Sequence, residues 1–285
     1  MTNNANTTSR IGIVTINYNN ARLTQKLLES VSRAVGADDV TVVVVDNASN
    51  ENDRADLMEV ETSFPRAMFI YEDVNHGYFK GINVGLAALR HTAEAPGTVI
   101  VCNNDIEFSD DFFITLKASG RLLEDHAVIS PRIVTPSGRE QNPHVIQPIS
   151  RARVIVWQIY YSNYTLARII FWLARHSAPI TARRDYRQYK VAQKIEQGYG
   201  ACYILTSDFF AHYKDLWAPT FLMGEEYFLS CQLKAVGKSV YYEPSLRVVH
   251  QDHATMGMLP NKKVWDISRR SFQVYLSYRQ KYGRP

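Results

Sequence analysis

Short polar clusters follow three apolar stretches in the first half of the chain, and their residue types suit a phosphorylated ligand. The clusters are residues 17–20, 46–49 and 103–105, and each begins where an apolar run ends. An apolar run bounded in this way indicates a buried strand of a parallel sheet. The carboxyl ends of such strands share one edge of the sheet, where open α/β folds bind ligands. We therefore expect the clusters to converge, with Asp105 holding a divalent metal against a phosphate; the alternative is that residues 103–105 only begin a turn.

Other carboxylates and histidines could join this chemistry, although each has a structural alternative. Asp46 could accept a hydrogen bond from the imide N–H of uracil or thymine, or it could cap the helix that follows. Glu225 and Glu226 are adjacent at an expected helix start. One of them could be a general base, or both could be there because the helix dipole favours acidic residues. His250 and His253 follow an expected strand, where they could ligate the same metal or be purely structural.

Three glycines are spaced four residues apart at positions 77, 81 and 85. In a helix this spacing puts them on one face, where backbone or ligand can approach closely. Glycine disfavours helices, so the repetition has a cause. Either the helix packs closely on the sheet, or its start faces a phosphate or sugar with Lys80 nearby.

The elements that position these residues alternate between strands and helices. We expect strands at residues 11–16, 41–45, 68–71, 98–102, 198–205, 239–242 and 246–249. We expect helices at residues 23–34, 50–61, 80–90, 112–123, 207–213, 227–236 and 264–282, and a loop at 131–148. This rhythm predicts right-handed βαβ units, and so an α/β fold with a mostly parallel, twisted central sheet flanked by helices.

The segment 151–175 differs from the rest because it combines aliphatic and aromatic residues with arginines at its ends and in its middle. Polar residues interrupt its apolar core, which argues against a transmembrane helix. Its composition suits an amphipathic segment lying in a membrane interface. The alternative is a buried or dimer-forming helix hairpin.

Composition restricts the class of protein. The 285 residues are 46% hydrophobic and 21% charged, with a net charge of +4, and no long run of like charge suggests a nucleic-acid partner. Three cysteines, far apart and odd in number, give no disulfide framework and indicate a reducing, cytoplasmic compartment. Residues 1–10 are polar, and we expect a disordered N-terminus and not a signal peptide.

As an ordered set, these stretches resemble the family 2 glycosyltransferases with the GT-A fold. The likeness is greatest to bacterial enzymes of the rhamnosyltransferase-like group that build surface polysaccharides such as O-antigen or capsule. The matching stretches are residues 13–19, 45–49, 75–85, 103–105, 200–205 and 221–250.

The resemblance implies one GT-A domain over residues 11–255, followed by a helical tail at 256–285. Residues 11–108 would bind a nucleotide-sugar. Residues 109–255, with the amphipathic insertion 151–175, would bind the acceptor. That acceptor would be a glycan or a lipid-linked oligosaccharide, and the protein would be cytoplasmic, with peripheral contact to the inner membrane or a homodimer formed through the insertion.

The resemblance also implies roles for individual residues. Asp105, with His250, would bind Mg²⁺ or Mn²⁺ at the place of the family's Asp-x-Asp motif. Asp46 would contact the base. The residues implied in nucleotide-sugar binding are Thr15, Asn17, Asn19, Asp46, Asn75, Gly77, Lys80, Asn83, Asn103 and Asn104.

The family usually has Glu-Asp where this chain has Glu225-Glu226, and the second position is the catalytic base. Glutamate reaches one methylene further than aspartate, so the sequence leaves open which of the pair acts. The implied reaction is inverting transfer of a sugar from a UDP- or dTDP-sugar to an acceptor hydroxyl. The competing hypotheses are a non-catalytic nucleotide-sugar-binding subunit on the same fold and a nucleotidyltransferase.

Overall fold

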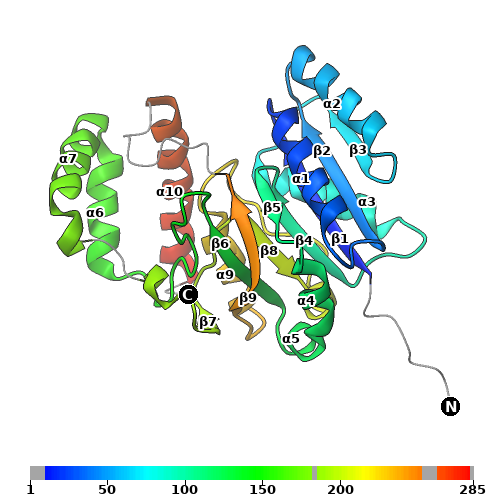
Figure 1. Ribbon diagram of the computed structural model, residues 1–285. Helices are drawn as coiled ribbons and strands as arrows, with labels where there is room; N and C mark the ends of the chain where they lie inside the picture. The colour runs from blue at the N-terminus through cyan, green and yellow to red at the C-terminus, as the bar shows by residue number, and fades with distance from the viewer. Residues whose placement is uncertain (1–9, 182–184, 252–261, 283–285) are drawn as a thin grey trace.

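The first half of the chain forms a parallel sheet (Figure 1). The computed structural model describes residues 10–181, 185–251 and 262–282. Its first strands are β1 (Ile11–Asn17), β2 (Val40–Asn47), β3 (Met68–Glu72) and β4 (Thr98–Asn103). They lie in the order β3-β2-β1-β4, with every neighbouring pair parallel. All of β1 is buried, which explains why its sequence is a continuous apolar run and not an alternating one.

Helices α1 (Ala21–Arg33), α2 (Glu51–Ser63) and α3 (Tyr78–Arg90) connect these strands. The predicted strand–helix alternation of this half is therefore confirmed. Asn50 caps α2 by accepting a hydrogen bond from the backbone N–H of Asp53 at 3.1 Å. Each crossover returns the chain to the same edge of the sheet, so the polar clusters that follow β1, β2 and β4 lie together.

The second half extends this sheet with strands in mixed directions. They are β5 (Ile106–Phe108), β6 (Val128–Val134), β7 (Gln193–Ile195), β8 (Cys202–Leu205) and β9 (Val240–His250). β8 is antiparallel to β4 and to β6, β6 is parallel to β9, and β5 and β7 are antiparallel to β9. The nine-stranded sheet confirms the α/β fold with flanking helices, and all pairings among β1, β2, β3 and β4 are parallel.

Several expected boundaries were wrong. The loop predicted at 131–148 begins inside β6, because Pro131 lies at a shift in the β6–β9 register where no ladder N–H is needed. The two short strands expected at 239–242 and 246–249 are one strand, β9. The single helix expected at 112–123 is two, α4 (Phe112–Ala118) and α5 (Gly120–Asp125).

The two faces of the sheet pack into two separate cores. In β1, Ile11 and Ile13 face one core, while Val14 and Ile16 face the other. Leu27 of α1 and Phe112 of α4 belong to the first core. The second core includes residues of α3 and of the helices α8 (Ser207–His212) and α9 (Glu225–Lys234). Burial on both faces fixes the register of the strands, and so the positions of the residues at their ends.

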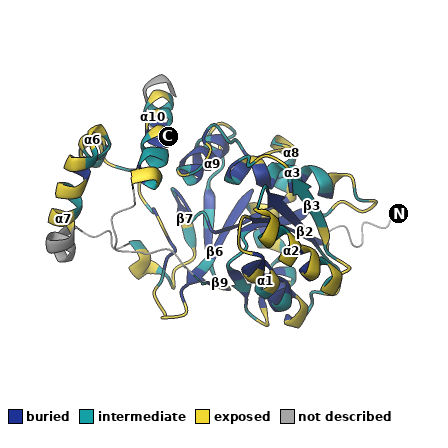
Figure 2. Ribbon diagram, turned by 90° about the horizontal axis from the view of Figure 1, so that it is seen from above, coloured by how far each residue is buried: buried dark blue, intermediate teal, exposed yellow. Residues whose placement is uncertain are grey.

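A helical unit stands beside the sheet. It consists of α6 (Arg151–Ser162), α7 (Tyr164–Thr181) and the C-terminal α10 (Lys262–Tyr282). Figure 1 shows α6 and α7 as a hairpin next to α10, and a short 3₁₀ helix (Asp185–Gln188) follows the hairpin. The segment 151–175 is thus a helix hairpin, although it is not buried, because many of its apolar residues are exposed (Figure 2).

Some expectations fall outside this description. The disordered N-terminus expected at 1–10 lies, except for Arg10, outside the described residues, as does the start of the tail expected from residue 256. Within the described ranges, no helix is both long enough and apolar enough to span a bilayer.

Candidate active site

Asp105 and His250 face each other at the edge of the sheet. Asp105 directly precedes β5 and His250 ends β9, and the antiparallel pairing of these strands brings the two together. Oδ1 of Asp105 lies 3.1 Å from Nε2 of His250. These two predicted metal ligands, which are far apart in the sequence, are therefore neighbours in the fold.

The chemistry of this pair fits a cation. His250 Nδ1 lies 2.9 Å from the amide oxygen of Gln141, a contact that turns the other ring nitrogen, Nε2, towards Asp105. Oδ1 of Asp105 is shielded from solvent, and its contact with His250 lacks hydrogen-bond geometry, so the oxygen has no donor among the described residues. A carboxylate oxygen and an imidazole nitrogen at this distance are stabilised by a cation between or beside them, either a ring proton or a metal ion. A carboxylate oxygen and a neutral imidazole nitrogen are ligands that Mn²⁺ accepts, and Mg²⁺ accepts the carboxylate.

The described side chains alone do not complete a metal site. Within the described residues, no cluster of three or more His, Cys, Asp or Glu side chains could enclose an ion. His253, the other predicted histidine ligand, lies outside these residues. Asp105 and His250 could therefore hold an ion whose other ligands come from a phosphate group and water.

Asn103 and Asn104 connect this pair to β1 and β8. Asn103 donates its backbone N–H to the carbonyl of Ala201 at 2.9 Å. The side-chain amide of Asn104 donates to Asn17 Oδ1 at 3.3 Å and to Thr24 Oγ1 at 3.0 Å. Asn104 thus holds the turn before β5 against β1, which positions Asp105.

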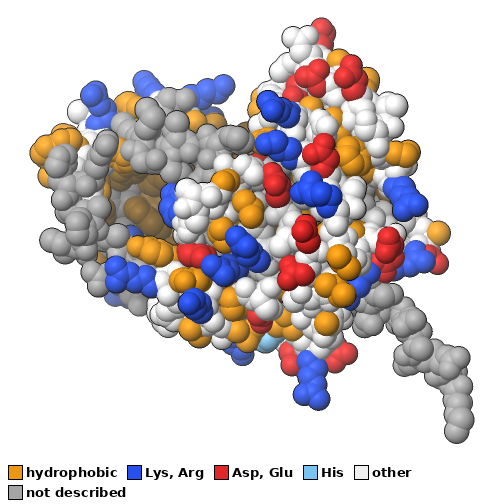
Figure 3. Space-filling model, in the orientation of Figure 1, with side chains coloured by type: hydrophobic (Ala, Val, Ile, Leu, Met, Phe, Trp, Pro, Cys, Tyr) orange, Lys and Arg blue, Asp and Glu red, His pale blue; other side chains and the backbone are white. Residues whose placement is uncertain are grey.

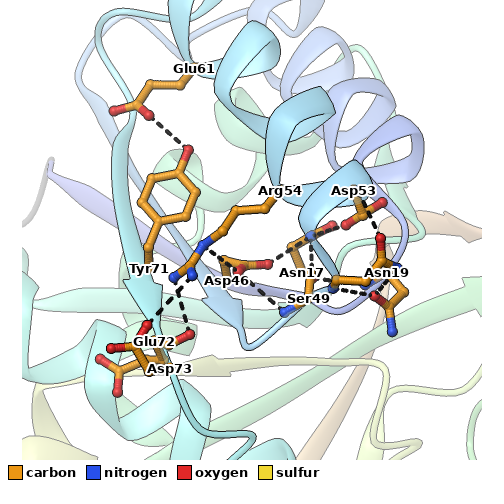
Figure 4. A network of polar contacts seen from close by, with 11 residues as sticks. Asn17, Asn19, Asp46, Ser49, Asp53, Arg54, Glu61, Tyr71, Glu72 and Asp73 are labelled. Atoms are coloured by element: carbon orange, nitrogen blue, oxygen red, sulfur yellow. Dashed lines mark hydrogen bonds and ion pairs between the residues drawn. The ribbon is translucent and has the colours of Figure 1, made fainter.

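Asp46 lies at the centre of a polar network at the ends of β1 and β2 (Figure 4). Its Oδ1 accepts a hydrogen bond from Asn17 at 3.1 Å, and its Oδ2 lies 3.5 Å from Nε of Arg54. Arg54 also stacks over the ring of Tyr71, 5.3 Å from its centroid. Asp46 has no exposed surface beneath these neighbours. A base that binds Asp46 must therefore displace Arg54.

Asn17 and Asn19 organise the same network. The amide of Asn17 donates to Asp46, Ser49 and Asp53, the last at 2.8 Å. Asn19 has a left-handed backbone with φ of 56°, and its Oδ1 accepts the backbone N–H of Asn50 at 2.8 Å. Both asparagines join β1 to the start of α2, so they shape the site predicted for the base.

Two of the predicted nucleotide-sugar contacts need correction. Thr15 has no exposed surface and faces the interior beside Cys102, because the alternation of β1 turns it into the first core. Asn83 bonds the backbone of Leu216 through both of its polar atoms, at 2.8 and 2.9 Å, and so joins α3 to the chain before α9. Both residues support the fold and neither presents itself to a ligand.

The glycine repeat is explained mainly by close packing. A Cβ on Gly85 would lie 2.3 Å from Cγ1 of Val14, and one on Gly81 would lie 2.8 Å from Cδ1 of Ile16. Gly77 precedes α3 with φ of 81°, and a Cβ there would overlap the carbonyl of Phe221. If the start of this helix binds a phosphate or sugar, the glycines do not do so themselves, and the candidate residues are those at the tip of the helix.

Those residues are Asn75 and Lys80. Oδ1 of Asn75 accepts the backbone N–H of Gly77 at 2.9 Å and the amide of Asn47 at 3.1 Å. Lys80 is exposed and makes no hydrogen bond or ion pair within the described part of the chain. Its ammonium group is thus available to a ligand.

The structure distinguishes Glu225 from Glu226. Glu225 is buried, with 7% of its surface exposed, and its Oε1 accepts the backbone N–H of Met223 at 2.9 Å. Burial, together with the negative charge of Glu226, raises the pKa of Glu225 to about 7. Glu226 is partly exposed, and its carboxylate has no hydrogen-bond or ion-pair partner among the described residues. Glu225 therefore holds the turn before α9, and Glu226 is the available carboxylate.

Glu226 faces an aromatic cavity of about 190 Å³. Other lining residues come from the helical unit, from α9 and from the chain before β8, and they include Trp157, Tyr161, Gln197, Tyr227, Phe272 and Tyr275. The side chain of Gln197 makes no hydrogen bond with any described residue. A free carboxylate and a free amide thus lie in a largely aromatic pocket, which is typical of a site for a small organic ligand.

Residues 199–201 join the cavity to the Asp105–His250 pair. A Cβ on Gly200 would lie 2.6 Å from Oε1 of Glu226. The ring of the preceding Tyr199 contacts the ring of His250, with centroids 5.7 Å apart. The predicted base and metal residues therefore lie on either side of one short segment.

Sequence reasoning missed several residues of this site. Neither Gly200 nor Tyr199 was predicted as a site residue, although Gly200 belongs to the matching stretch 200–205 and the glycines at 198 and 200 signalled close backbone approach. Arg54 is an ordinary helix arginine in the sequence. Gln141, which orients His250, gave no signal because it lies far from both β5 and β9 in the chain.

Comparisons with known proteins agree with this fold. No curated protein matches the chain significantly. Two solved structures resemble it with a TM-score of 0.55. One is the mannosyltransferase PcManGT from Pyrobaculum calidifontis in complex with GDP-Man and Mn²⁺, at 16% identity, covering 97% of this chain and 66% of that one. The other is GalNAc-T7 with UDP, GalNAc and Mn²⁺, at 13% identity, covering 90% of this chain and 46% of that one.

These identities are low, so the structural likeness shows a shared fold alone, and this chain spans less than two thirds of the length of either protein. The family model described as glycosyl transferase family 2 matches residues 12–185, which is more than half of the chain. The matched region includes Asp46, Asn104 and Asp105. On the strength of that match, the protein belongs to glycosyl transferase family 2.

Proposed function

We propose that this protein is an inverting glycosyltransferase that moves a sugar from a UDP- or dTDP-sugar to a hydroxyl group of a glycan acceptor. The observation that carries the proposal is the carboxylate of Glu226, which has no partner among the described residues, faces an aromatic cavity and is joined to the Asp105–His250 pair by residues 199–201. A group that removes a proton must be free to accept it and must lie where the substrate hydroxyl can reach it. Glu226 meets both conditions and Glu225 meets neither.

The donor would lie along the edge of the sheet. The base would bind near Asp46, and the diphosphate near Asp105, with Lys80 and Asn75 at the tip of α3 close to the sugar or phosphate. Asp105 and His250 would hold Mn²⁺ or Mg²⁺, which offsets negative charge on the departing diphosphate when bound. The solved neighbours were obtained with Mn²⁺ and with nucleotide or nucleotide-sugar, which supports this arrangement.

Glu226 would act on the acceptor. As the acceptor oxygen bonds the anomeric carbon, its proton passes to the carboxylate of Glu226, and the bond from that carbon to the diphosphate oxygen breaks on the opposite face. The nucleoside diphosphate carries away the bonding electrons, so the anomeric configuration inverts. The proton transfer is the step for which this chain supplies its own group.

The acceptor would occupy the aromatic cavity. Rings such as Trp157 and Tyr275 offer apolar faces to the C–H surfaces of a sugar, while the Gln197 amide offers hydrogen bonds to its hydroxyl groups. We further propose that this acceptor is a lipid-linked oligosaccharide in the synthesis of a bacterial surface polysaccharide, used at the cytoplasmic face of the inner membrane.

The test combines donor binding with product analysis. A panel of nucleotide-sugars that includes UDP-, dTDP- and GDP-sugars is screened by thermal shift with and without Mn²⁺, since a bound donor stabilises the folded state according to its occupancy. The stabilising donor is then incubated with acceptor glycans. We expect release of a nucleoside diphosphate with wild type, and retained donor stabilisation without transfer in Glu226→Gln.

Two results would contradict the proposal. Release of pyrophosphate instead of a nucleoside diphosphate would identify a nucleotidyltransferase. Donor stabilisation with neither hydrolysis nor transfer, across all acceptors and both metals, would identify a non-catalytic nucleotide-sugar-binding subunit.

A further inference from the structure

The outer surface of the α6–α7 hairpin is unusually apolar. Among the described residues, seven of the seventeen exposed large hydrophobic side chains lie on these two helices. They are Ile155, Val156, Ile159, Leu166, Ile169, Trp172 and Leu173, and we call this set the outer face. Figure 3 shows hydrophobic side chains at the outer edge of the hairpin, on the left. Trp172, with 59% of its surface exposed, is the largest of them.

The outer face is not needed to attach the hairpin to the rest of the protein. The opposite side of α6 does that, because Val154 and Trp157 pack with Phe272 and Tyr275 of α10. The attached residues and the exposed residues of α6 lie one or two positions apart in the sequence, which in a helix places them on different faces. An apolar surface that the fold leaves open marks a site of interaction.

The charge of this region indicates the kind of partner. Between Glu140 and Asp185 the sequence has no acidic residue and six arginines. The six are Arg151, Arg153, Arg168, Arg175, Arg183 and Arg184. Arg151 and Arg168 are exposed, and neither makes an ion pair with a described residue. Exposed arginines such as Arg151 and Arg168 beside an apolar helical surface complement a layer of anionic headgroups above an acyl region.

We propose that the outer face of the hairpin docks on an anionic lipid surface. The apolar side chains enter the boundary between headgroups and acyl chains, Trp172 lies at the level of the headgroups, and Arg151 and Arg168 contact lipid phosphates. Vesicle binding follows from this surface alone. The purpose of the docking rests on the proposed function. The inner side of α6 lines the cavity that Glu226 faces, so docking would bring a lipid-linked acceptor to the base.

A second copy of the chain is a poorer occupant. In a two-fold interface the same patch meets itself, so Arg151 and Arg168 would approach the same arginines of the other copy. No acidic residue between Glu140 and Asp185 could compensate for this repulsion. An anionic lipid surface supplies the missing negative charge.

The experiment is flotation of the full-length protein with vesicles of phosphatidylcholine, alone or mixed with an equal amount of phosphatidylglycerol. We expect wild type to float with the mixed vesicles and not with the neutral ones, and to be released by salt. Ile169→Glu combined with Trp172→Glu is expected to weaken binding by about ten-fold or more, because it removes apolar contact and adds negative charge. Arg151→Gln and Arg168→Gln are each expected to cost about five-fold.

Matched controls lie elsewhere on the surface. Ile114 of α4 has 51% of its surface exposed, against 50% for Ile169, and Ile114→Glu is expected to bind vesicles like wild type. Arg121→Gln on α5 is the control for the arginine variants, and it is also expected to bind vesicles like wild type. Thermal unfolding and the donor thermal shift of each variant show that its fold and donor site are intact.

Each outcome is decisive. Loss of vesicle binding only in the outer-face and arginine variants supports the proposal, whatever the protein is found to catalyse. Failure of wild type to float with anionic vesicles, or equal binding by the outer-face variant, would overturn it. A change in molar mass from dimer to monomer in the outer-face variant, without vesicle binding by wild type, would assign the face to a second copy instead. Vesicle binding by a protein that binds no nucleotide-sugar would reject the proposed function alone.

Discussion

Oε1 of Glu226 lies 2.6 Å from the point where a Cβ atom on Gly200 would stand. The carboxylate can therefore occupy this position only because residue 200 has no side chain. Gly200→Ala should displace the carboxylate, which is the flexible end of its side chain, and lower transfer with little change in the unfolding temperature. Gly120→Ala, where a Cβ meets nothing within 4 Å, is the control. Unchanged transfer by Gly200→Ala would show that Glu226 acts from another position.

The two adjacent glutamates should separate kinetically. Glu226→Gln is expected to lower the transfer rate by about 10²- to 10⁴-fold, the usual contribution of a general base, with the donor dissociation constant unchanged. Glu225→Gln keeps an acceptor for the N–H of Met223, so we expect a much smaller loss of rate. Steady-state kinetics and donor titration of both variants make the comparison. A larger loss in Glu225→Gln would reverse the assignment.

Metal binding can be tested without measuring activity. Asp105→Asn removes the carboxylate charge that lies 3.1 Å from Nε2 of His250 and keeps the size of the side chain, so it should abolish the metal site without a cavity. Mn²⁺ with a nucleoside diphosphate should stabilise wild type and not the variant. Gln141→Ala, which removes the partner of His250 Nδ1, should weaken Mn²⁺ binding by about 10- to 100-fold. Thermal shift and Mn²⁺ titration measure both, with Gln25→Ala on α1 as the control. Equal stabilisation of Asp105→Asn by Mn²⁺ would remove Asp105 from the site.

Stability should depend on pH through Glu225. Its pKa is raised to about 7 in the folded state, from an ordinary 4.5, so the folded state holds a proton that the unfolded state has already lost. The contribution of Glu225 to stability is therefore fully present below about pH 4.5 and is lost as pH rises towards and through 7, a change of up to about 3 kcal/mol. Glu225→Gln should remove this slope, and Glu226→Gln should reduce it because a neighbouring negative charge is lost. Urea unfolding at several pH values measures the slope, and an identical slope in Glu225→Gln would contradict the prediction.

Arg54 should compete with the donor for Asp46. Its Nε lies 3.5 Å from the carboxylate, and a partly exposed pair of this kind contributes up to about 1 kcal/mol. Arg54→Gln is thus expected to tighten nucleotide binding by up to about five-fold, whereas Asp46→Ala should weaken it. Titration calorimetry with the free nucleotide measures both, with Arg22→Gln on α1 as the control. Weaker binding by Arg54→Gln would mean that Arg54 contacts the nucleotide.

The packing of α3 on the sheet predicts a stability effect. Gly85→Ala would bring a methyl group within 2.3 Å of Val14 in the buried centre of β1, so we expect a loss of about 1–3 kcal/mol in the free energy of unfolding. The same change at Gly120, in α5, should stabilise slightly because alanine favours a helix. Chemical unfolding of the two variants gives the comparison. An unchanged stability of Gly85→Ala would show that α3 can move away from the sheet.

The sequence by itself determined the α/β architecture of the first half and the residues at the ends of its strands. Strand and helix periods are local properties of the sequence. Burial on both faces makes β1, β2 and β4 mostly apolar, so these strands can be recognised without any knowledge of their partners. The convergence of residues 17–20, 46–49 and 103–105 followed from one rule about parallel strands. The second half was less legible, because antiparallel pairing and the proline in β6 depend on neighbours distant in the chain.

Only the tertiary structure decided how the individual residues are used. Glu225 and Glu226 are indistinguishable in sequence, and burial of one and exposure of the other to a cavity separate them. Thr15 and Asn83 matched the family pattern. However, the side chain of Thr15 is buried in the interior, and that of Asn83 bonds the backbone of Leu216. The pairing of Asp105 with His250 arises from contact between two strands that are distant in sequence. The outer face of the hairpin is apolar and exposed because no other described segment covers it. Local patterns specify elements, while the use of a polar side chain depends on which distant groups the fold brings beside it.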